Sequence, residues 1–525
     1  MSLESTRSAT SLALEIPELL GFIALYISDN RHLTACALVC KAWNEKFSAS
    51  LYRHLKFNIN TSPNTLSGAI RHADHMRSLE IATNFDKTLF PLPFNRLRTL
   101  TIMHRSLSPD DPTSVILQVS NLIRQNNSTL QDITVCYMNV FTPALWEAIS
   151  TCSKLGKIRL TESIARGVDM LKLLDAIKQA RVFDVIHASI DFSEVKLPPT
   201  TTSPLRLPNL QHLQIFMPKG FLGDISTIIQ HAPNLRSLNL DSQLQPRLVP
   251  HMRELVVPLQ RCQKLQDISL LNMRLSSEES AMVLDATMDA KLLNWEVRGF
   301  SQNALRSLIS RHARTITDLY LVGSPELCSS MTQAIMTSCP LLEFLRLFTI
   351  SGTDLVRVEK AGQGNQNTER VILGEDWICL GLKTLSLQFD LSSKTMNIDR
   401  NTPEGEAVFQ RQQQLEQYHA FRQIGRLTRL QDLLIIKFMP NGEYGRSLDL
   451  RLEANGGGLE GLAALKELDY IEFRGTKQEL SKDEIDWMLY QLPRLSCLKG
   501  RYHSDEAKNE NLNKYAGVRL RERHG

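Results

Sequence analysis

The chain has 525 residues, of which 42% are apolar and 22% are charged, proportions typical of a globular protein. This composition excludes a disordered chain, a collagen and a small disulfide-rich scaffold. Sixty Lys and Arg against 56 Asp and Glu leave a net charge of +4, which over this length is too small to predict a phosphate-coating surface. We therefore expect no nucleic-acid partner.

The first apolar run covers residues 19–27 and has the length of a signal-peptide core. Glu15, Pro17 and Glu18 precede it, however, and no cleavage site of small residues follows. We therefore interpret it as an amphipathic helix. No run in the chain approaches the roughly 18–20 apolar residues of a membrane span. We expect a cytoplasmic and/or nuclear protein with no membrane partner.

Residues 12–57 have the pattern of a small module of three helices. Pro17 suits a first helical turn, where its missing N–H costs nothing. Apolar residues then recur at helical spacing over 19–27 and 33–43, and a third short helix is predicted over 47–52. A unit of about 40 residues has a marginal core. Its large apolar residues serve either a binding partner or the covering of neighbouring repeats, and composition does not separate these alternatives.

A specific combination of residues occurs within this module. An Ile-Pro-Glu-Leu-Leu start at Ile16 is followed by a further Ile, by a Leu that opens the second helix and by Val-Cys-x-x-Trp ending at Trp43. Over residues 14–52 this combination resembles an F-box. The resemblance implies docking of a Skp-type adaptor, which joins an F-box protein to a cullin and its RING subunit. It assigns that contact to Ile16, Pro17, Leu19, Leu20, Ile23, Leu33, Val39, Cys40 and Trp43.

The longer part of the chain, residues 58–503, repeats a short frame of the form Leu-x-x-Leu-x-Leu. Between Leu210 and Leu342 the copies start 24 to 30 residues apart, close to the spacing of leucine-rich repeats. The alternation within each frame predicts a strand with one buried face, and helical stretches precede many frames. Such units stack into a curved solenoid with strands on its concave side. The frames start at Leu97, Leu130, Leu155, Leu210, Leu235, Leu265, Leu292, Ile316, Leu342, Leu382 and Leu430, with weaker copies at Met76, at Leu465, Leu468 and Tyr470, and at Leu495.

Several of the nine cysteines share one phase of this repeat. Four of them, Cys152, Cys262, Cys339 and Cys379, stand three residues before the first Leu of a frame. This favours a small buried side chain at the turn from helix to strand. Because the cysteine count is odd and no Cys-x-x-Cys pair occurs, we expect reduced thiols. The pattern over about 76–498 resembles cysteine-containing leucine-rich repeats, which implies an α/β fold, a horseshoe-shaped solenoid preceded by the three-helix module.

Polar segments interrupt or end the repeats. Three insertions, at residues 354–376, 391–414 and 440–455, are too long for ordinary turns. They are either disordered or binding loops, and we expect disorder in the first two. Residues 1–11 are expected to be a disordered start, and residues 504–525 a solvated polar tail.

No catalytic constellation stands out in the sequence. His72 and His75, with Asp74 between them, have a metal-like spacing but no third ligand of matching context. The glycine-rich stretches at 362–364 and 456–458 lack the strand and helix of a nucleotide fingerprint. We therefore expect no catalytic residue, no metal and no cofactor.

The F-box resemblance implies the substrate-recognition subunit of an SCF-type (Skp–cullin–F-box) ubiquitin ligase, a non-catalytic subunit that holds a target beside the conjugating enzyme. The alternative is a non-catalytic protein-binding scaffold whose N-terminal helices only cap the solenoid, and an enzyme acting on a small molecule ranks third. The end of the chain resembles long fungal F-box repeat proteins, which implies a fungal source.

Two neighbouring frames carry aromatic and Arg residues between their leucines. Such residues are expected on the concave face, and their composition is typical of interface hot spots. The alternative is that a neighbouring loop covers the phenylalanines. The predicted target-binding residues are Tyr320, Phe344, Arg346 and Phe348.

Overall fold

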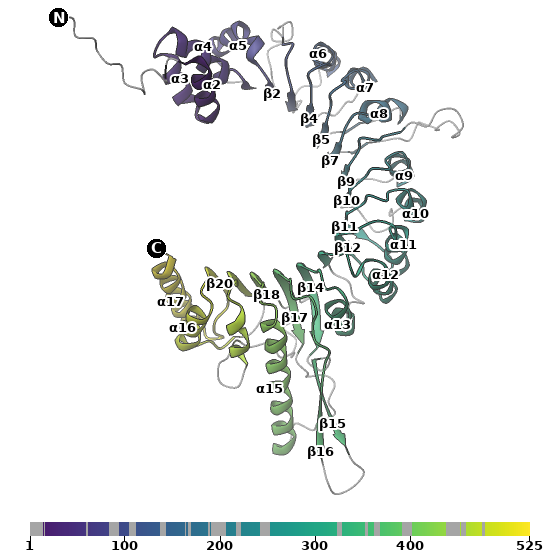
Figure 1. Cartoon of the computed structure of the whole chain (residues 1–525), viewed down its shortest axis with the longest axis vertical. Helices are drawn as coiled ribbons and strands as arrows, with labels where there is room; N and C mark the ends of the chain where they lie inside the picture. The colour runs from purple at the N-terminus through teal and green to yellow at the C-terminus, as the bar shows by residue number, and fades with distance from the viewer. Residues whose placement is uncertain are drawn as a thin grey trace, which may run out of the picture. The chain divides into compact units, whose positions relative to one another are not determined.

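The computed structural model forms two compact units, Met1–Cys262 and Gln263–Gly525 (Figure 1). Each unit combines a parallel sheet with helices that lie along one side of its strands. The structure describes residues 14, 16–58, 61–82, 94–103, 112–136, 143–162, 164–165, 170–186, 189–190, 206–216, 222–241, 252–322, 328–351, 355–361, 368–390, 402–436, 452, 458–474 and 478–524.

The main sheet of the first unit contains strands in the order β1-β2-β3-β4-β5-β7-β9-β10. Every neighbouring pair in this series is parallel. The strands are β1 His54–Phe57, β2 Ser78–Ala82, β3 Thr99–Met103, β4 Asp132–Cys136, β5 Lys157–Thr161, β7 Val182–Ile186, β9 His212–Phe216 and β10 Ser237–Asp241, and a second small sheet pairs β6 Ile164–Ala165 with β8 Ser189–Ile190.

Helices occupy most of the connections between these strands, so each repeat is a helix, a turn and a strand. Prolines begin several of the helices, where the first turn has no use for their missing N–H. The helices of the first unit after the N-terminal module are α5 Pro63–Arg71, η1 Ala73–His75, α6 Pro112–Gln125, α7 Pro143–Ser150, α8 Met170–Ile177, α9 Leu222–Gln230 and α10 Arg253–Gln260.

The predicted frame residues form continuous buried rows across the strands. Leu100 is in register with Ile133, and Ile133 with Ile158. All three side chains are 0% exposed, and burying each such side chain contributes about 1.5–3 kcal/mol. The leucine-rich-repeat solenoid predicted from the periodicity is therefore confirmed. Two strands that the periodicity missed, β1 and β7, belong to the same rows.

The second unit repeats this arrangement in the order β11-β12-β13-β14-β17-β18-β19-β20. Its helices are α11 Ser277–Ala286, α12 Gln302–His312, α13 Ser329–Ser338, α15 Pro403–Gly425, η4 Leu459–Ala464, α16 Lys482–Gln491 and α17 Glu506–His524. Its strands are β11 Asp267–Arg274, β12 Asn294–Arg298, β13 Asp318–Val322, β14 Phe344–Ser351, β17 Thr384–Asp390, β18 Asp432–Ile436, β19 Tyr470–Arg474 and β20 Cys497–Gly500.

One weak frame was placed wrongly by the sequence. Leu465 and Leu468 are buried in the turn, and the buried strand residues are Ile471 and Phe473, which are in register with Leu433 and Ile435. Tyr470, predicted to be buried in the strand, is half-buried at its start. The additional leucine, Leu465, placed the predicted frame three residues too early, because the frame in the structure starts at Leu468.

The expectation of disorder is wrong for large parts of the first two insertions. Val356–Ala361 (β15) and Thr368–Leu373 (β16) form an antiparallel hairpin. The second insertion contributes the first half of α15, a 23-residue helix that buries Phe409 and Gln412 of the insertion itself. Its Gln-rich sequence has good helix propensity, which a reading of polarity alone overlooks. Residues 362–367 and 391–401, and most of 440–455, lie outside the described residues.

The predicted polar tail is a helix, α17, most of whose side chains are exposed and one face of which packs on the protein. Leu512 and Ala516 are buried, and the Tyr515 hydroxyl donates a 2.6 Å hydrogen bond to Asp486 of α16. Only a few apolar residues of this charged sequence are buried, which explains why the hydrophobic periodicity gave no signal. Among the described residues, no helix combines the length and hydropathy that a membrane crossing needs.

The four phased cysteines are buried, as predicted. Burial raises the pKa of each thiol to about 12, so all four are protonated at neutral pH. Cys262 shows why the position must be small, because its sulfur lies 3.6 Å from the carbonyl oxygens of both Ala232 and Pro258. A larger side chain would separate these neighbouring turns.

Thiol labelling of the native chain tests this arrangement. Cys40 and Cys328 are exposed, so we expect them to react promptly with a disulfide reagent at neutral pH. Cys152, Cys262, Cys339 and Cys379 should react only after denaturant is added. Peptide mapping identifies the labelled sites, and prompt native labelling of the four would contradict the packing described.

A buried histidine at the end of α12 makes the stability depend on pH. His312 is 0% exposed, and its Nε2 lies 3.1 Å from the Leu284 carbonyl oxygen. Burial lowers the pKa of His312 below its ordinary value. The folded state therefore keeps it neutral at a pH where the unfolded chain binds a proton. The contribution of His312 to the free energy of unfolding is therefore present above the pKa of an unfolded histidine, about 6.5, and is lost as the pH falls below that value.

We expect denaturant midpoints to fall between about pH 7 and pH 5, and to fall less steeply in His312→Gln. The substitution itself should cost about 1–2 kcal/mol at pH 7 through the altered hydrogen bond. Chemical unfolding at each pH followed by circular dichroism gives both values. An unchanged slope in the variant would show that His312 is not the titrating group.

Candidate functional site

The N-terminal module contains three helices, α2 Pro17–Tyr26, α3 Asn30–Ala37 and α4 Lys41–Leu51. Asp29 begins α3 by accepting a 2.8 Å hydrogen bond from the Arg31 backbone N–H, the usual N-cap arrangement. Asn44 of α4 donates from Nδ2 to the Ala37 carbonyl oxygen at 3.0 Å, which ties α4 to the end of α3. Hydrogen bonds therefore fix α3 and its junction with α4, whereas α2 joins them through the apolar side chains of Leu20 and Ala24.

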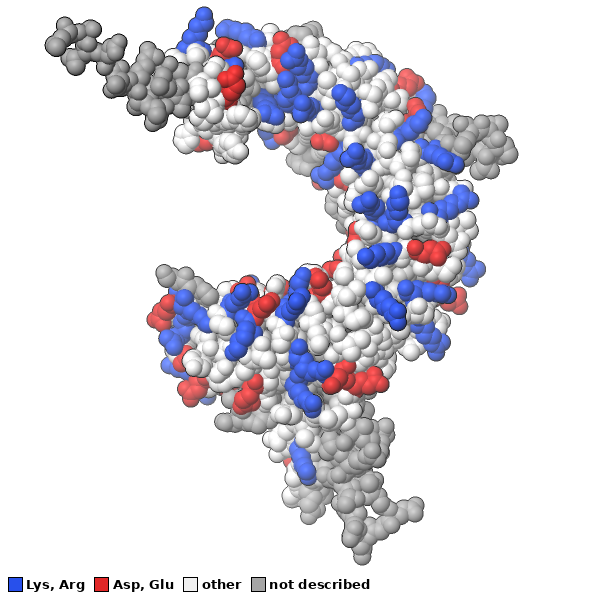
Figure 2. All heavy atoms as spheres, viewed as in Figure 1, with Lys and Arg blue, Asp and Glu red and all other residues white. Residues whose placement is uncertain are grey.

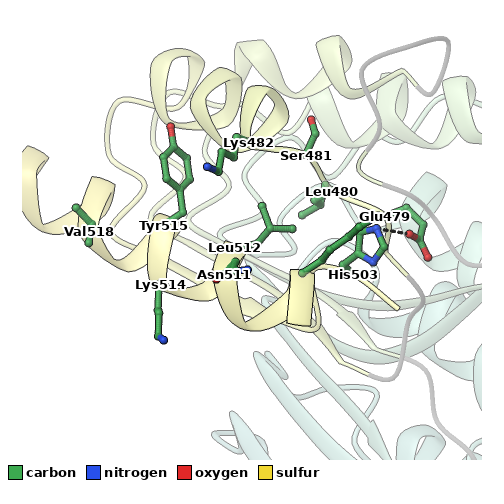
Figure 3. Close-up of a pocket in the computed structure, with 11 residues that line it drawn as sticks. Glu479, Leu480, Ser481, Lys482, His503, Asn511, Leu512, Lys514, Tyr515 and Val518 are labelled. Atoms are coloured by element: carbon green, nitrogen blue, oxygen red, sulfur yellow. Dashed lines mark ion pairs between the residues drawn. The ribbon is translucent and has the colours of Figure 1, made fainter. Parts of the chain in front are cut away.

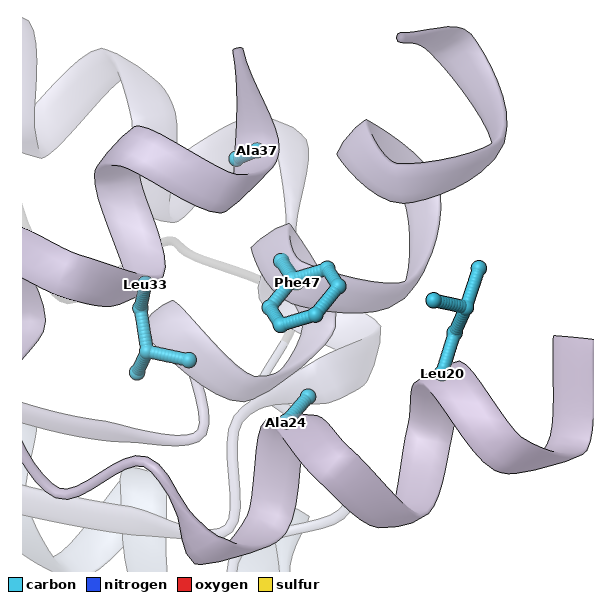
Figure 4. Close-up of a cluster of buried hydrophobic side chains, with 5 residues drawn as sticks. All are labelled: Leu20, Ala24, Leu33, Ala37 and Phe47. Carbon is cyan, nitrogen blue, oxygen red and sulfur yellow. The ribbon is translucent and has the colours of Figure 1, made fainter. Parts of the chain in front are cut away.

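The core of this module is small (Figure 4). Phe47 of α4 lies among aliphatic side chains from α2 and α3, and Trp43 stacks on it with 5.1 Å between ring centroids. The side chains that share this core are Leu20, Ala24, Leu33, Ala37 and Phe47, with Leu14, Ile27, Cys36, Trp43 and Leu51 partly buried around them.

Outside this core the module exposes many large apolar side chains. Of the twenty such residues exposed in the described parts of the chain, eight fall between Ile16 and Val39. Tyr26 is 87% exposed and Leu38 is 79% exposed. We define the apolar surface of the module as Ile16, Leu19, Phe22, Ile23, Leu25, Tyr26, Leu38 and Val39. Concentration of exposed apolar residues in one segment is typical of an interaction site.

The residues assigned by the F-box resemblance divide between this surface and the core. Leu20 and Leu33 are buried within the module, and Trp43 is partly buried over Phe47. Their substitution would act through folding. The exposed members are Ile16, Pro17, Leu19, Ile23, Val39 and Cys40.

Sequence reasoning missed four members of the surface: Phe22, Leu25, Tyr26 and Leu38. The signal was present, because α2 reads Pro-Glu-Leu-Leu-Gly-Phe-Ile-Ala-Leu-Tyr and is apolar on every side. A helix of this kind belongs in a protein interior or against a partner. The core takes only the side that carries Leu20 and Ala24.

The predicted target-binding residues lie on adjacent strands of the second unit. Tyr320 of β13 is in register with Arg346 of β14, and Asp318 with Phe344. Tyr320 and Phe344 are half-buried and Arg346 is exposed. A register shift between Arg346 and Phe348 places Phe348 opposite Leu387, and its side chain lies outside the described residues.

Charged groups surround these aromatic residues. Burial raises the pKa of Asp318, and the carboxylates of Glu343 and Glu296 add to the shift, although the Thr317 hydroxyl hydrogen-bonded at 2.6 Å opposes it. Lys383 forms a 2.5 Å ion pair with Glu343 and lies 6.0 Å from the centroid of the Phe344 ring. A cation therefore flanks one side of Phe344.

A pocket of about 720 Å³ lies between α17 and the segment that leads into α16 (Figure 3). It contains a serine and a histidine, but the two are engaged separately. Ser481 forms a capping box with Glu484. His503 pairs through Nε2 with Glu479 at 2.9 Å, and its Nδ1 accepts from the Asp505 N–H. The pocket thus lacks an activated nucleophile, and no three potential metal ligands meet within the described parts of the chain.

Comparison with known proteins yields likeness in structure alone. No family model matches the chain, and no curated protein matches it. One similar solved structure is an internalin (inlF) from Listeria monocytogenes str. 4b F2365, at 10% identity and a TM-score of 0.42 over 77% of this chain and 92% of that one. Another is TLR13 in its complex with ssRNA13, at 13% identity and a TM-score of 0.31 over 82% of this chain and 67% of that one. With scores this low, the leucine-rich-repeat assignment rests on the strand register of this chain itself.

Core and surface substitutions in the module should behave differently. We expect Phe47→Ala to destabilise the module by about 3–5 kcal/mol, because it empties the centre of a small core. Phe22→Ser should change stability by no more than about 0.5 kcal/mol. Hydrogen exchange of residues 17–51 in the full chain measures both effects, and equal losses in the two variants would mean that Phe22 belongs to the core.

Proposed function

We propose that the chain is the substrate-recognition subunit of an SCF-type ubiquitin ligase, and that the module is an F-box that binds a Skp-type adaptor through its apolar surface. The observation that carries the proposal is the exposure of eight large apolar side chains between Ile16 and Val39. Soluble proteins rarely expose such a concentration without a partner. The F-box-like sequence of the same segment supports a Skp-type adaptor as that partner.

The alternative, a module that only caps the repeats, accounts for fewer observations. Contacts toward the first repeat use other residues: Tyr52 stacks on His72 with 4.6 Å between ring centroids, and β1, which follows α4, pairs with β2. These contacts cover the first repeat. They leave the apolar surface exposed, so capping does not explain why it is apolar.

In this proposal the repeats bind the target and the adaptor links the chain to a cullin and its RING subunit. Tyr320, Phe344 and Arg346 are the proposed target contacts, and the register of β13 and β14 supports their forming one surface. The subunit acts by proximity, since holding the target beside the conjugating enzyme makes transfer local. A cytoplasmic or nuclear location follows from this role.

Binding of a purified Skp-type adaptor to the full chain, measured by calorimetry, tests the proposal. We expect the double variant Leu19→Ser/Ile23→Ser to bind at least about tenfold more weakly, because two central apolar contacts are lost. Val39→Ser should weaken binding in the same direction. Val257→Ser is the matched control, since Val257 is 57% exposed on α10, outside the module.

Thermal melting of each variant shows whether it remains folded. Wild-type binding that is lost in the folded Leu19→Ser/Ile23→Ser variant and kept in Val257→Ser supports the F-box. Absence of binding by the folded wild type would contradict it and would favour the scaffold alternative.

A further inference from the structure

One backbone position recurs in every repeat, the residue immediately before each strand. In the first repeats its N–H donates to the carbonyl of the same position one repeat earlier. Arg77 donates to the Arg53 oxygen at 2.9 Å, Arg98 to that of Arg77 at 2.7 Å, and Gln131 to that of Arg98 at 2.7 Å. Successive residues in this row therefore lie about one strand spacing apart, roughly 4.8 Å.

Side chains at this position reach one another across neighbouring repeats. In the second unit the position is occupied in successive repeats by Glu343 and Lys383, whose backbones are joined by a 2.7 Å hydrogen bond. Their side chains form an ion pair of 2.5 Å. Here the row places opposite charges in contact.

In the first unit the same row carries three arginines in succession: Arg53, Arg77 and Arg98. Arg77 donates from Nη1 to the carbonyl oxygens of Asp74 and Met76 at 2.7 and 2.9 Å, so its charge meets no carboxylate there. The Nε of Arg53 is buried without a hydrogen-bond partner. No described carboxylate pairs with any of the three, so this row is a stack of like charges.

The surroundings of this arginine row are basic as well. Burial, followed by the guanidinium groups of Arg96, Arg98 and Arg53, lowers the pKa of Arg77, and the Asp74 carboxylate opposes this shift only in part. An arginine nevertheless stays charged at neutral pH. Figure 2 shows Lys and Arg side chains gathered near α5 and β2. The described residues of 53–103 include six Lys or Arg against two acidic residues: Arg53, Lys56, Arg71, Arg77, Arg96 and Arg98 against Asp74 and Glu80.

The row is also held rigidly. Asn126 is buried and accepts a 2.9 Å hydrogen bond from the Leu97 N–H through Oδ1, and the Thr129 hydroxyl donates to the Leu97 carbonyl at 2.8 Å. These contacts fix the turn that carries Arg98. Because this turn is fixed, movement of the backbone does not relieve the repulsion that Arg98 and Arg53 exert on Arg77, and an anion bound between the three side chains would relieve it.

We propose that Arg53, Arg77 and Arg98 form a binding site for a phosphoryl group, with Arg96 at its margin. A carboxylate offers one charge and two oxygens in one plane. A phosphoryl group carries about −1.5 to −2 charges and three acceptor oxygens that diverge, which suits three guanidinium groups in a row. Arginine forms strong paired hydrogen bonds with such oxygens. The site is independent of the apolar surface of the module.

The phosphoryl group could belong to a free polyphosphate or to a phosphorylated protein, and two probes separate these sources. Sodium tripolyphosphate represents the first, and a short Gly/Ser peptide with one phosphoserine represents the second. Sulfate at the same ionic strength and the unphosphorylated peptide are the respective controls. Calorimetry with the full chain measures binding of each probe.

Arg98 is the arginine to replace, because its side chain is exposed and its loss should not disturb the packing. We expect Arg98→Gln to bind the preferred probe about tenfold more weakly and Arg98→Lys to retain part of the affinity. Arg181→Gln is the matched control, because Arg181 occupies the same backbone position and is exposed, but lies between Gly156 and Gln211 in the row. It should bind like the wild type.

Melting without ligand distinguishes a binding role from a structural one. Since Arg98→Gln removes a like charge, its melting temperature should equal or exceed that of the wild type. Binding of tripolyphosphate identifies a free ligand, and binding of the phosphopeptide alone identifies a protein-borne one. Binding of neither probe, or equal weakening in Arg181→Gln, would overturn the proposal.

Discussion

The whole structure depends on rows of apolar side chains that run across the parallel strands in register. No single helix–strand unit can bury its own apolar face, so each repeat is stable only against its neighbours. The side chains in these rows are almost entirely buried, and their summed burial outweighs the many polar and irregular connections between strands. The same regular spacing also determines which exposed residues of neighbouring repeats lie next to each other. Both the arginine row and the pair of Tyr320 with Arg346 follow from it.

A stack of this kind has two ends, and the described ends differ. At the carboxyl end, α17 buries Leu512 and Ala516, and its Tyr515 and Arg519 side chains both bind Asp486 of α16, as a cap does. The N-terminal module meets the first repeat through Tyr52 but has apolar residues on the sides that do not face its own core. Within α2, Leu20 and Ala24 are the residues buried in the core of the module. The remaining apolar residues of α2 are exposed, and this difference between the two ends is what the proposed docking role would explain.

The sequence was sufficient for features that repeat and insufficient for features that occur once. Buried leucines and phased cysteines recur, so the strands and the four inaccessible thiols could be predicted. Strand β7 was missed because Ala180 stands where most frames begin with Leu and because Phe183 replaces the next leucine. Helices α15 and α17 were missed because a few buried residues anchor otherwise polar sequences. The arginine row could not be predicted, since it depends on register between residues 53, 77 and 98, which are unevenly spaced in the chain.

Hydrogen exchange of the full chain with and without a saturating Skp-type adaptor tests the central claim most directly. Because the account assigns the adaptor to the apolar surface, exchange should slow over residues 16–39 and remain unchanged over the repeat strands. Protection confined to the repeats, or no protection in a folded chain, would contradict it. In that case the module would be a cap whose apolar residues serve some other contact.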